Sequence, residues 1–186
     1  MIPTCKNALA ASLIVLICAV AGFAQAPPEI KTKLDAEIKK LTSLSTDSEI
    51  VNAVKAHNAT PATAEALAMT NDKWHSLSVL DFFVRATAKT PLSDYLKAKK
   101  ATDDTIAKVF VSGADGSKVG FDSKTEHWTH KDLPKHEVPM TGQTWIGPVK
   151  VDDSTGQQLI QVGLSVLDGK KPIGSIVIGL RVDKLL

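Results

Sequence analysis

The sequence predicts an α+β fold in which several helices precede and cover an antiparallel β-sheet. Two observations lead to this prediction. In the first half of the 186-residue chain, apolar residues recur every three or four positions, as on one face of a helix. From residue 106 onward they alternate with polar residues or glycines, and short turns of Asp and Gly separate the runs. Helices followed by a meander of strands form a layered domain.

The first helix is expected within residues 25–46. Lysines and Asp35 occupy its outer faces, and an apolar stripe follows steps of three and four along it. The stripe consists of Ile30, Leu34, Ile38, Leu41 and Leu44. This helix is therefore expected to lie on the surface with one face packed against the domain, and it also offers a surface for dimerisation.

Three further helices are predicted from their start signals. Thr46 and Glu49 have the spacing of a capping box, so a helix is expected to begin there. Proline is favoured at the first position of a helix, so Pro61 predicts a helix that runs to Trp74, and Pro91 predicts another short one.

Five strands are expected in the second half of the chain, giving a sheet of five or six antiparallel strands. They cover residues 109–111, 118–122, 145–151, 159–167 and 173–182. The last two alternate cleanly, with one apolar face and one face that carries Gly163 and Gly179. A glycine in a strand leaves room for a helix backbone or a ligand to approach closely.

A polar segment from residue 123 to residue 143 interrupts the strands. It contains Pro134 and Pro139, and the sequence predicts irregular structure for it. Unstructured segments of this length are uncommon in compact domains and often have a function. The search for a binding site therefore concentrates on this segment.

The N-terminus has the pattern of a secretory signal peptide. Lys6 precedes an apolar run from Ala8 to Ala21, and small residues follow it. Because Pro27 disfavours cleavage after Ala26, we expect cleavage after Ala24 or Ala21, which makes residues 1–24 a signal peptide. The protein is then secreted or periplasmic, and the alternative is an uncleaved membrane anchor.

Composition excludes several classes of function. The two cysteines, Cys5 and Cys18, both lie in the predicted signal peptide, so the mature chain has no disulfide, thiolate nucleophile or cysteine-ligated metal. Without Lys6 the chain has 21 basic and 20 acidic side chains, which does not indicate a nucleic-acid-binding protein. None of the common catalytic or nucleotide-binding motifs occurs, so no cofactor is predicted and the protein is not expected to be an enzyme.

Several short motifs are spread over residues 47–186: they are residues 71–74, 91–96, 109–116, 145–154 and 161–185, the last with its Asp-Gly hairpin and Ile-Gly strand. Together they resemble the Cache (PDC, PAS-like) family of extracytoplasmic sensor domains. Lys124, Thr125 and Trp128 resemble a pocket-side motif of one secreted subgroup. The chain departs from that subgroup at Gly113, at Ser165 and in the run that follows Trp128.

The resemblance implies a PAS-like sheet and a module that binds a small molecule. The chain ends at Leu186, directly after the last expected strand, where a receptor of this family would continue into a membrane helix. It is therefore expected to be a stand-alone secreted member that signals through a partner, such as a membrane receptor or another signalling protein.

The expected ligand-binding residues come from the polar segment and the strands beside it. Aromatic side chains would form the walls of a pocket, and polar ones would orient the ligand. The aromatic candidates are Phe110, Phe121, Trp128 and Trp145, and the polar ones are Asp122, Thr125, His127 and Asp132. Trp128 stands out because it lies in a polar stretch outside any strand periodicity.

Two alternatives remain. Imidazole and carboxylate side chains suit a divalent metal, so His127, His130 and His136 form an alternative metal-binding group, although no zinc signature is present. The other alternative is a purely structural interaction domain, whose aromatic residues would simply fill the core.

Overall fold

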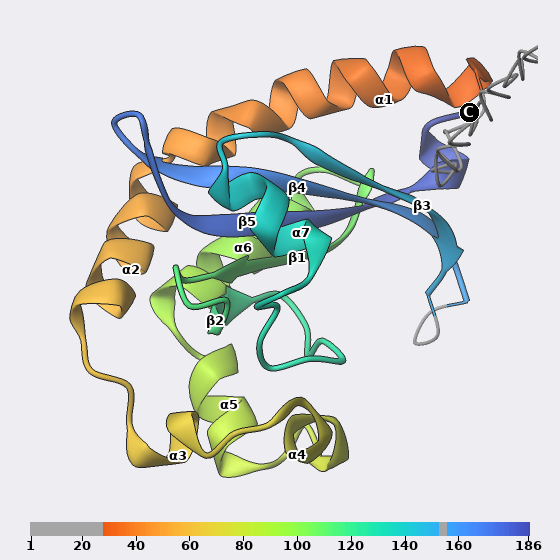
Figure 1. Cartoon of the computed structure of the whole chain (residues 1–186). Coiled ribbons are helices and arrows are strands. Elements are labelled where there is room, and N and C mark those ends of the chain that lie inside the picture. Colours follow the sequence, from red (N-terminus) through yellow and green to blue (C-terminus); the bar gives the residue numbers. More distant parts are fainter. Residues whose placement is uncertain (1–27, 153–155) are drawn as a thin grey trace, which may run out of the picture.

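A five-stranded antiparallel sheet forms the centre of the protein, with the strand order β2-β1-β5-β4-β3 (Figure 1). The computed structural model describes residues 28–152 and 156–186, so the predicted signal peptide lies outside the described residues. The strands are β1 (Ile106–Ser112), β2 (Lys118–Phe121), β3 (Trp145–Val151), β4 (Gln158–Asp168) and β5 (Lys171–Arg181). The predicted α+β class and antiparallel sheet are confirmed.

One face of the sheet, here called the aliphatic face, is covered by α1 (Pro28–Leu41), α2 (Ser48–Ala59) and α6 (Pro91–Ala101). Strand alternation places aliphatic side chains on this face, among them Val109, Ile160, Leu164 and Ile178. The apolar stripe of α1 packs onto it, with Ile30 and Leu34 almost fully buried. As expected for the first helix, the rest of α1 faces solvent.

The opposite face, here called the polar face, is covered by shorter elements. They are α4 (Asn71–Ser76) and α5 (Phe82–Ala88) near β2, and α7 (Pro134–Met140) near β4. A Cβ atom at Gly163 would lie 2.8 Å from the carbonyl oxygen of Lys135, so the backbone of α7 approaches β4 closely there. This confirms the expectation that Gly163 makes room for a helix, whereas at Gly179 a Cβ would make only ordinary contacts, at 3.4 Å or more.

Two of the predicted helix starts are wrong. Asp47, not Thr46, caps α2, because its carboxylate accepts a hydrogen bond from the Glu49 backbone N–H at 3.1 Å. The Thr42–Thr46 segment before it forms a short 3₁₀ helix that continues α1. The start predicted at Thr90 and Pro91 is confirmed, since the Thr90 hydroxyl accepts from the Ser93 N–H at 3.2 Å.

The single helix predicted from Pro61 to Trp74 is two short helices, α3 (Ala64–Leu67) and α4. The side chains of Thr63 and Thr70 accept hydrogen bonds from backbone N–H groups three residues ahead, at 3.2 and 3.1 Å. Each threonine therefore caps a new helix, and the chain turns between them.

Two helices lie where none was predicted. One is α5, capped by Asp81, whose carboxylate accepts from the Phe83 N–H at 2.9 Å. The other is α7, which lies within the segment expected to be irregular and has Pro134 in its first turn. Proline fits that position because the first N–H groups of a helix have no partner within it.

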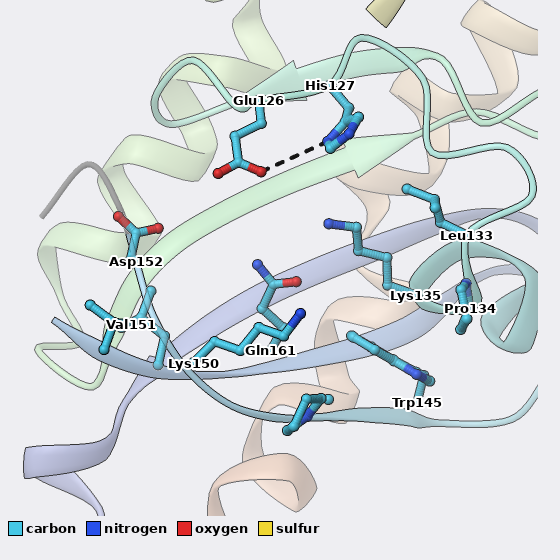
Figure 2. A pocket seen from close by; sticks show the side chains of 13 residues that line it. Glu126, His127, Leu133, Pro134, Lys135, Trp145, Lys150, Val151, Asp152 and Gln161 are labelled. Carbon is cyan, nitrogen blue, oxygen red and sulfur yellow. Dashed lines mark ion pairs between the residues drawn. The ribbon is translucent and has the colours of Figure 1, made fainter. Parts of the chain in front are cut away.

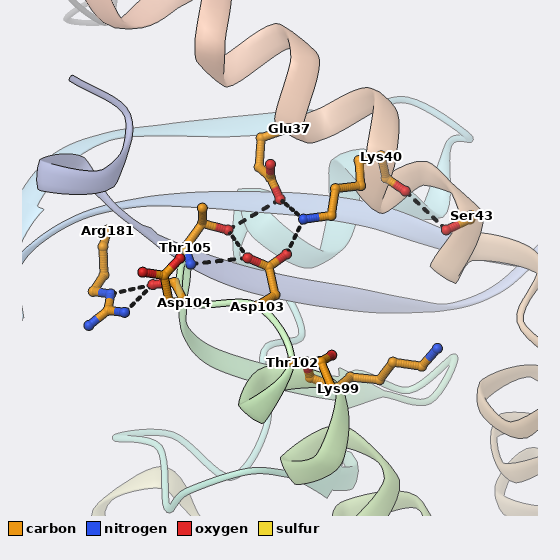
Figure 3. Close-up of polar contacts among 9 residues, drawn as sticks. All are labelled: Glu37, Lys40, Ser43, Lys99, Thr102, Asp103, Asp104, Thr105 and Arg181. Atoms are coloured by element: carbon orange, nitrogen blue, oxygen red, sulfur yellow. Dashed lines mark hydrogen bonds and ion pairs between the residues drawn. The ribbon is translucent and has the colours of Figure 1, made fainter.

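The C-terminal half of α1 is attached to the turn before β1 by a polar network (Figure 3). Lys40 forms ion pairs with Glu37, at 3.2 Å, and with Asp103. Burial opposes the ionisation of Asp103, but hydrogen bonds from Lys40 and Thr105 outweigh it and lower its pKa to about 2. Within residues 28–152 and 156–186, no helix has both the length and the apolar character needed to cross a membrane.

Candidate functional site

A pocket of about 410 Å³ lies on the polar face, between β3, β4 and the segment that leads into α7. Its wall includes Trp145 and Lys150 from β3, Gln161 from β4, and Glu126, His127 and Lys135 from the facing segment (Figure 2). β3 is an edge strand whose register shifts between Ile146 and Val149. A Cβ at Gly147 would lie 2.7 Å from the Trp145 ring, so the ring needs this glycine in order to lie across its own strand.

The side chains of Lys135, Lys150 and Gln161 point into the space below Glu126 and His127 in Figure 2. Lys135 is the innermost cation among them, and burial lowers its pKa, an effect that Glu126 partly offsets. Within residues 28–152 and 156–186, no carboxylate forms an ion pair with Lys135. Glu126 instead lies 4.0 Å from the imidazole of His127.

A buried polar pair lies behind the pocket, next to Phe110 of β1. Lys118 is only 2% exposed, and its Nζ lies 2.7 Å from Nδ1 of His130. The His130 ring stacks on the Phe110 ring at 4.5 Å, and the Lys118 Nζ lies 3.9 Å from the centre of the same ring. Burial lowers the pKa of Lys118 well below that of an ordinary lysine, and the charge of Lys135 adds to this effect.

His127 and Trp145 are the two predicted ligand-binding residues that line the pocket. His127 reaches it from the polar segment, as expected, and burial lowers its pKa. Trp145 is half-buried at the start of β3. An imidazole and an indole on opposite walls provide a hydrogen-bonding group and an apolar surface.

Trp128 lies in the core, which corrects the expectation of a loop side chain over a pocket. It is 6% exposed, and its ring lies 5.3 Å from that of Trp74 and 5.0 Å from that of Phe83. Phe110 and Phe121 belong to the same buried cluster. The residues next to Trp128 in the sequence are polar, but the Trp128 ring points inward. It completes an aromatic core formed by segments that are distant in the sequence.

The other three predicted polar residues lie outside this pocket. Asp122 accepts hydrogen bonds from Lys100 and from the Val109 N–H, each at 2.8 Å. The Thr125 hydroxyl donates to the His127 carbonyl at 2.9 Å. Asp132 is exposed in the left-handed backbone region, with φ 65°. None of the three lines the pocket.

The three histidines of the alternative metal site point to different partners. His130 contacts Lys118, whereas Nδ1 of His136 lies 2.7 Å from the Ser175 hydroxyl. The rings of His127 and His130 are 5.9 Å apart. In the part of the chain that the structure describes, no three His, Cys, Asp or Glu side chains gather as metal ligands.

Lys118, Lys135 and Gln161 were not among the predicted site residues. Gln161 shares its strand face with Gly163, and that face was predicted to admit a helix or a ligand, so a sequence signal existed for it. Lys135 lies in the suspected segment, but nothing local distinguishes it from the exposed lysines around it. The burial of Lys118 depends on the packing of His130 and Phe110, which come from other parts of the chain.

No family model matches the sequence, and a search of the curated proteins finds no match. Solved structures do match. The sensor domain of the V. cholerae histidine kinase DctB aligns over 84% of this chain and 53% of its own length, with 12% identity and a TM-score of 0.53. This chain therefore spans about half the length of that domain.

Two further matches have lower scores. The ligand-binding domain of the Campylobacter jejuni chemoreceptor Tlp3, solved with L-valine, aligns over 86% of this chain and 66% of its own, with 13% identity and a TM-score of 0.41. The E. coli DcuS sensor domain aligns over 65% of this chain and 89% of its own, with 15% identity and a TM-score of 0.38. At 12% identity the match to DctB shows the fold, which is the expected Cache/PDC-like sensor-domain fold.

Proposed function

We propose that this protein is an extracytoplasmic binding module of the sensor type and that the pocket beside Trp145 and Lys135 holds its small-molecule ligand. The Cache/PDC-like fold supports the class of protein. The pocket supports the site, because it combines an aromatic surface with converging polar groups. The single observation that carries the proposal is Lys135, a largely enclosed cation that faces the pocket and has no carboxylate partner among the described residues.

Binding without catalysis is part of this proposal. Ser117, His57 and Asp115 do lie together, but not as a catalytic triad. The Ser117 hydroxyl lies 3.0 Å from Nε2 of His57, and the Asp115 carboxylate approaches that same nitrogen, at 3.7 Å. A triad needs the acid on the other ring nitrogen, where it orients the base. Here the carboxylate accepts directly from the hydroxyl, at 2.7 Å, and closes the turn after β1.

Export and a signalling partner complete the proposal. Residues 1–24 have the pattern of a signal peptide, and the module would pass on its signal through a separate receptor or signalling protein. Mass spectrometry of the protein from its native host is expected to find a mature N-terminus at Gln25 or Gly22. An intact Met1 on a membrane-bound protein would contradict cleavage.

A thermal-shift screen tests the binding site. A ligand that binds only the folded state stabilises it by about 2.7 kcal/mol at a hundredfold excess over its dissociation constant, which a melting curve detects. The screen includes amino acids, short organic acids, amines and divalent ions, with EDTA as a separate condition. At least one small organic compound is expected to raise the melting temperature.

Two variants on the same strand show where this compound binds. Trp145→Ala is expected to abolish the shift, because the indole forms part of the wall. Ile146→Ala is the control, since Ile146 is 42% exposed and does not line the pocket. Equal responses in both variants would exclude this pocket. A response to divalent ions alone, with EDTA lowering the melting temperature, would favour the metal-binding alternative.

A further inference from the structure

Four side chains that can carry a positive charge gather beside Phe110, and we call them the cationic cluster: Lys118, Lys135, His127 and His130. The ammonium groups of Lys118 and Lys135 lie 3.9 and 5.8 Å from the centre of the Phe110 ring. His130 stacks on that ring, and His127 lies 5.9 Å from His130. Lys135 and His127 line the pocket, whereas Lys118 and His130 lie behind it.

Negative charge is scarce around this cluster. In the part of the chain that the structure describes, neither lysine forms an ion pair. Two carboxylates line the pocket: Glu126, at 4.0 Å from His127, and Asp152, which pairs with Lys108 of β1. Glu126 is itself mostly exposed, with 65% of its side chain accessible. By contrast, two other half-buried lysines each have a carboxylate partner: Lys100 pairs with Asp122 at 2.8 Å, and Lys108 pairs with Asp152.

A buried ammonium without a counter-charge is costly, so such a group tends to lose its proton instead. The contact at 2.7 Å between Lys118 Nζ and His130 Nδ1 joins the two groups into one pair, in which a neutral imidazole nitrogen accepts a hydrogen bond from the lysine. Ser112, which pairs with Lys118 across β1 and β2, is also fully buried, and its hydroxyl has no hydrogen-bond partner among the described residues. The interior here is polar but lacks an anion.

We infer that the ligand of this pocket carries an anionic group that binds at Lys135, and that the Lys118–His130 pair takes up one proton from solvent when this group arrives. The inference rests on the proposed function of the pocket and adds the charge of its ligand. The anion supplies the missing counter-charge, so the protonated pair becomes favourable where it was unfavourable before. The anion need not touch Lys118, because charges interact over several ångströms in a poorly hydrated interior.

Proton uptake has a predictable sign. Burial, followed by the charges of Lys118 and Lys135, lowers the pKa of His130, and burial also lowers the pKa of Lys118. The other ionisable groups that face the pair are His127 and His136, which lower the pKa of His130 further. At the pocket, Glu126 raises the pKa of Lys135 and of His127, whereas the charge of Lys150 lowers the pKa of Lys135. An anion raises these pKa values, so anion affinity is expected to fall as the pH rises.

The ligand class is tested with matched probes on the whole mature chain. The probes are succinate, acetate and inorganic phosphate as anions, succinamide as the uncharged analogue of succinate, and putrescine as the cation. At least one anion is expected to raise the melting temperature, whereas succinamide and putrescine are not. A shift with succinamide or putrescine alone would overturn the inference and leave the proposed function standing. No shift with any compound of the wider screen would contradict the proposed function itself.

Proton uptake is measured by titration calorimetry of the active anion in two buffers with different ionisation enthalpies. The wild type is expected to take up close to one proton, and its affinity to fall by about tenfold per pH unit in the range where the pair titrates. No proton uptake in the wild type would overturn this part of the inference without the use of any variant.

Three variants assign the roles. Lys135→Gln is expected to weaken anion binding by about tenfold or more, because a charge-assisted contact is lost. Lys118→Met is expected to bind the anion without proton uptake and with little dependence on pH. Lys131→Gln removes the same charge from an exposed site outside the pocket and is expected to behave as the wild type. Undiminished proton uptake in Lys118→Met would exclude the pair as the proton acceptor.

Discussion

The two faces of the sheet are built from the same strands but hold different interiors. The aliphatic face is a dry layer of branched side chains against α1, α2 and α6. The polar face buries Lys118, His130, His136 and Ser112 beside an aromatic cluster. The first arrangement is what a stable core requires, and the second costs free energy that a purely structural layer would not spend. This contrast is the reason why we propose that the polar face, with its buried polar groups next to a pocket, carries the function.

The largest effect is expected from an aromatic residue of the polar face. Trp128→Ala removes a ring that is 6% exposed and packs on Trp74 and Phe83, so unfolding should become easier by about 3–5 kcal/mol. Urea unfolding followed by circular dichroism measures this. A loss below about 1 kcal/mol would mean that the ring is not part of the core and would restore the loop position expected from sequence.

On the aliphatic face, Ile178→Ala is expected to cost about 2–5 kcal/mol, because Ile178 is fully buried in the middle of β5. The same unfolding measurement applies. Leu164→Ala on β4 provides a second test of the same layer. Near-neutral results at both positions would mean that this face does not form the main core.

Replacing the buried lysine distinguishes the two faces most sharply. Lys118→Met is expected to leave stability unchanged or raise it, by up to about 4 kcal/mol near neutral pH, because an apolar side chain replaces a buried amine. The aliphatic face offers no substitution of this kind, because its buried side chains are already apolar. A destabilisation of more than about 2 kcal/mol would show that the amine stabilises the fold.

The difference between Lys118→Met and the wild type should also depend on pH. The pKa of Lys118 is lower in the folded protein than in the unfolded chain, so between these two values the unfolded state binds more protons. Wild-type stability therefore gains up to about 1.4 kcal/mol per pH unit from this group as the pH rises towards 10. The difference in the free energy of unfolding between Lys118→Met and the wild type should therefore shrink as the pH rises. If the two proteins showed the same dependence of stability on pH, Lys118 would not be a buried neutral amine.

The smallest effect is expected where α1 meets the turn before β1. Lys40→Met removes the ion pairs with Glu37 and Asp103, but the lysine side chain is 58% exposed, so the loss should be about 0.2–1 kcal/mol. Raising the salt concentration should reduce the difference further, since exposed pairs are screened. A salt-independent loss would show that the network in Figure 3 acts through packing instead of charge.

The periodic parts of the fold could be predicted from sequence. Alternation in β4 and β5 identified their aliphatic face, and Gly163 identified the close approach of another element. The short helices were harder, because they depend on caps. Thr63, Thr70 and Asp81 each begin a helix by accepting one backbone hydrogen bond, and many Thr and Asp residues in loops look the same in sequence.

The candidate site could be predicted only in part. His127 and Trp145 were found because an imidazole in a polar segment and an indole at a strand start are both recognisable. Trp128 was wrongly predicted to lie over the pocket, because its neighbours in the sequence are polar. Whether a ring turns inward depends on Trp74 and Phe83, which are more than forty positions away along the chain.

By itself the sequence determined the α+β class and the aliphatic face of the sheet, and it predicts an export signal and the segment in which a site was to be sought. These follow from local periodicity and composition, which act over a few residues at a time. Only the tertiary structure decided which lysines are enclosed. Lys118 and Lys131 look alike in sequence, but one lies against Phe110 and His130 and the other faces solvent. Burial and missing counter-charge are properties of segments brought together by folding, and the ionisation of a side chain depends on both.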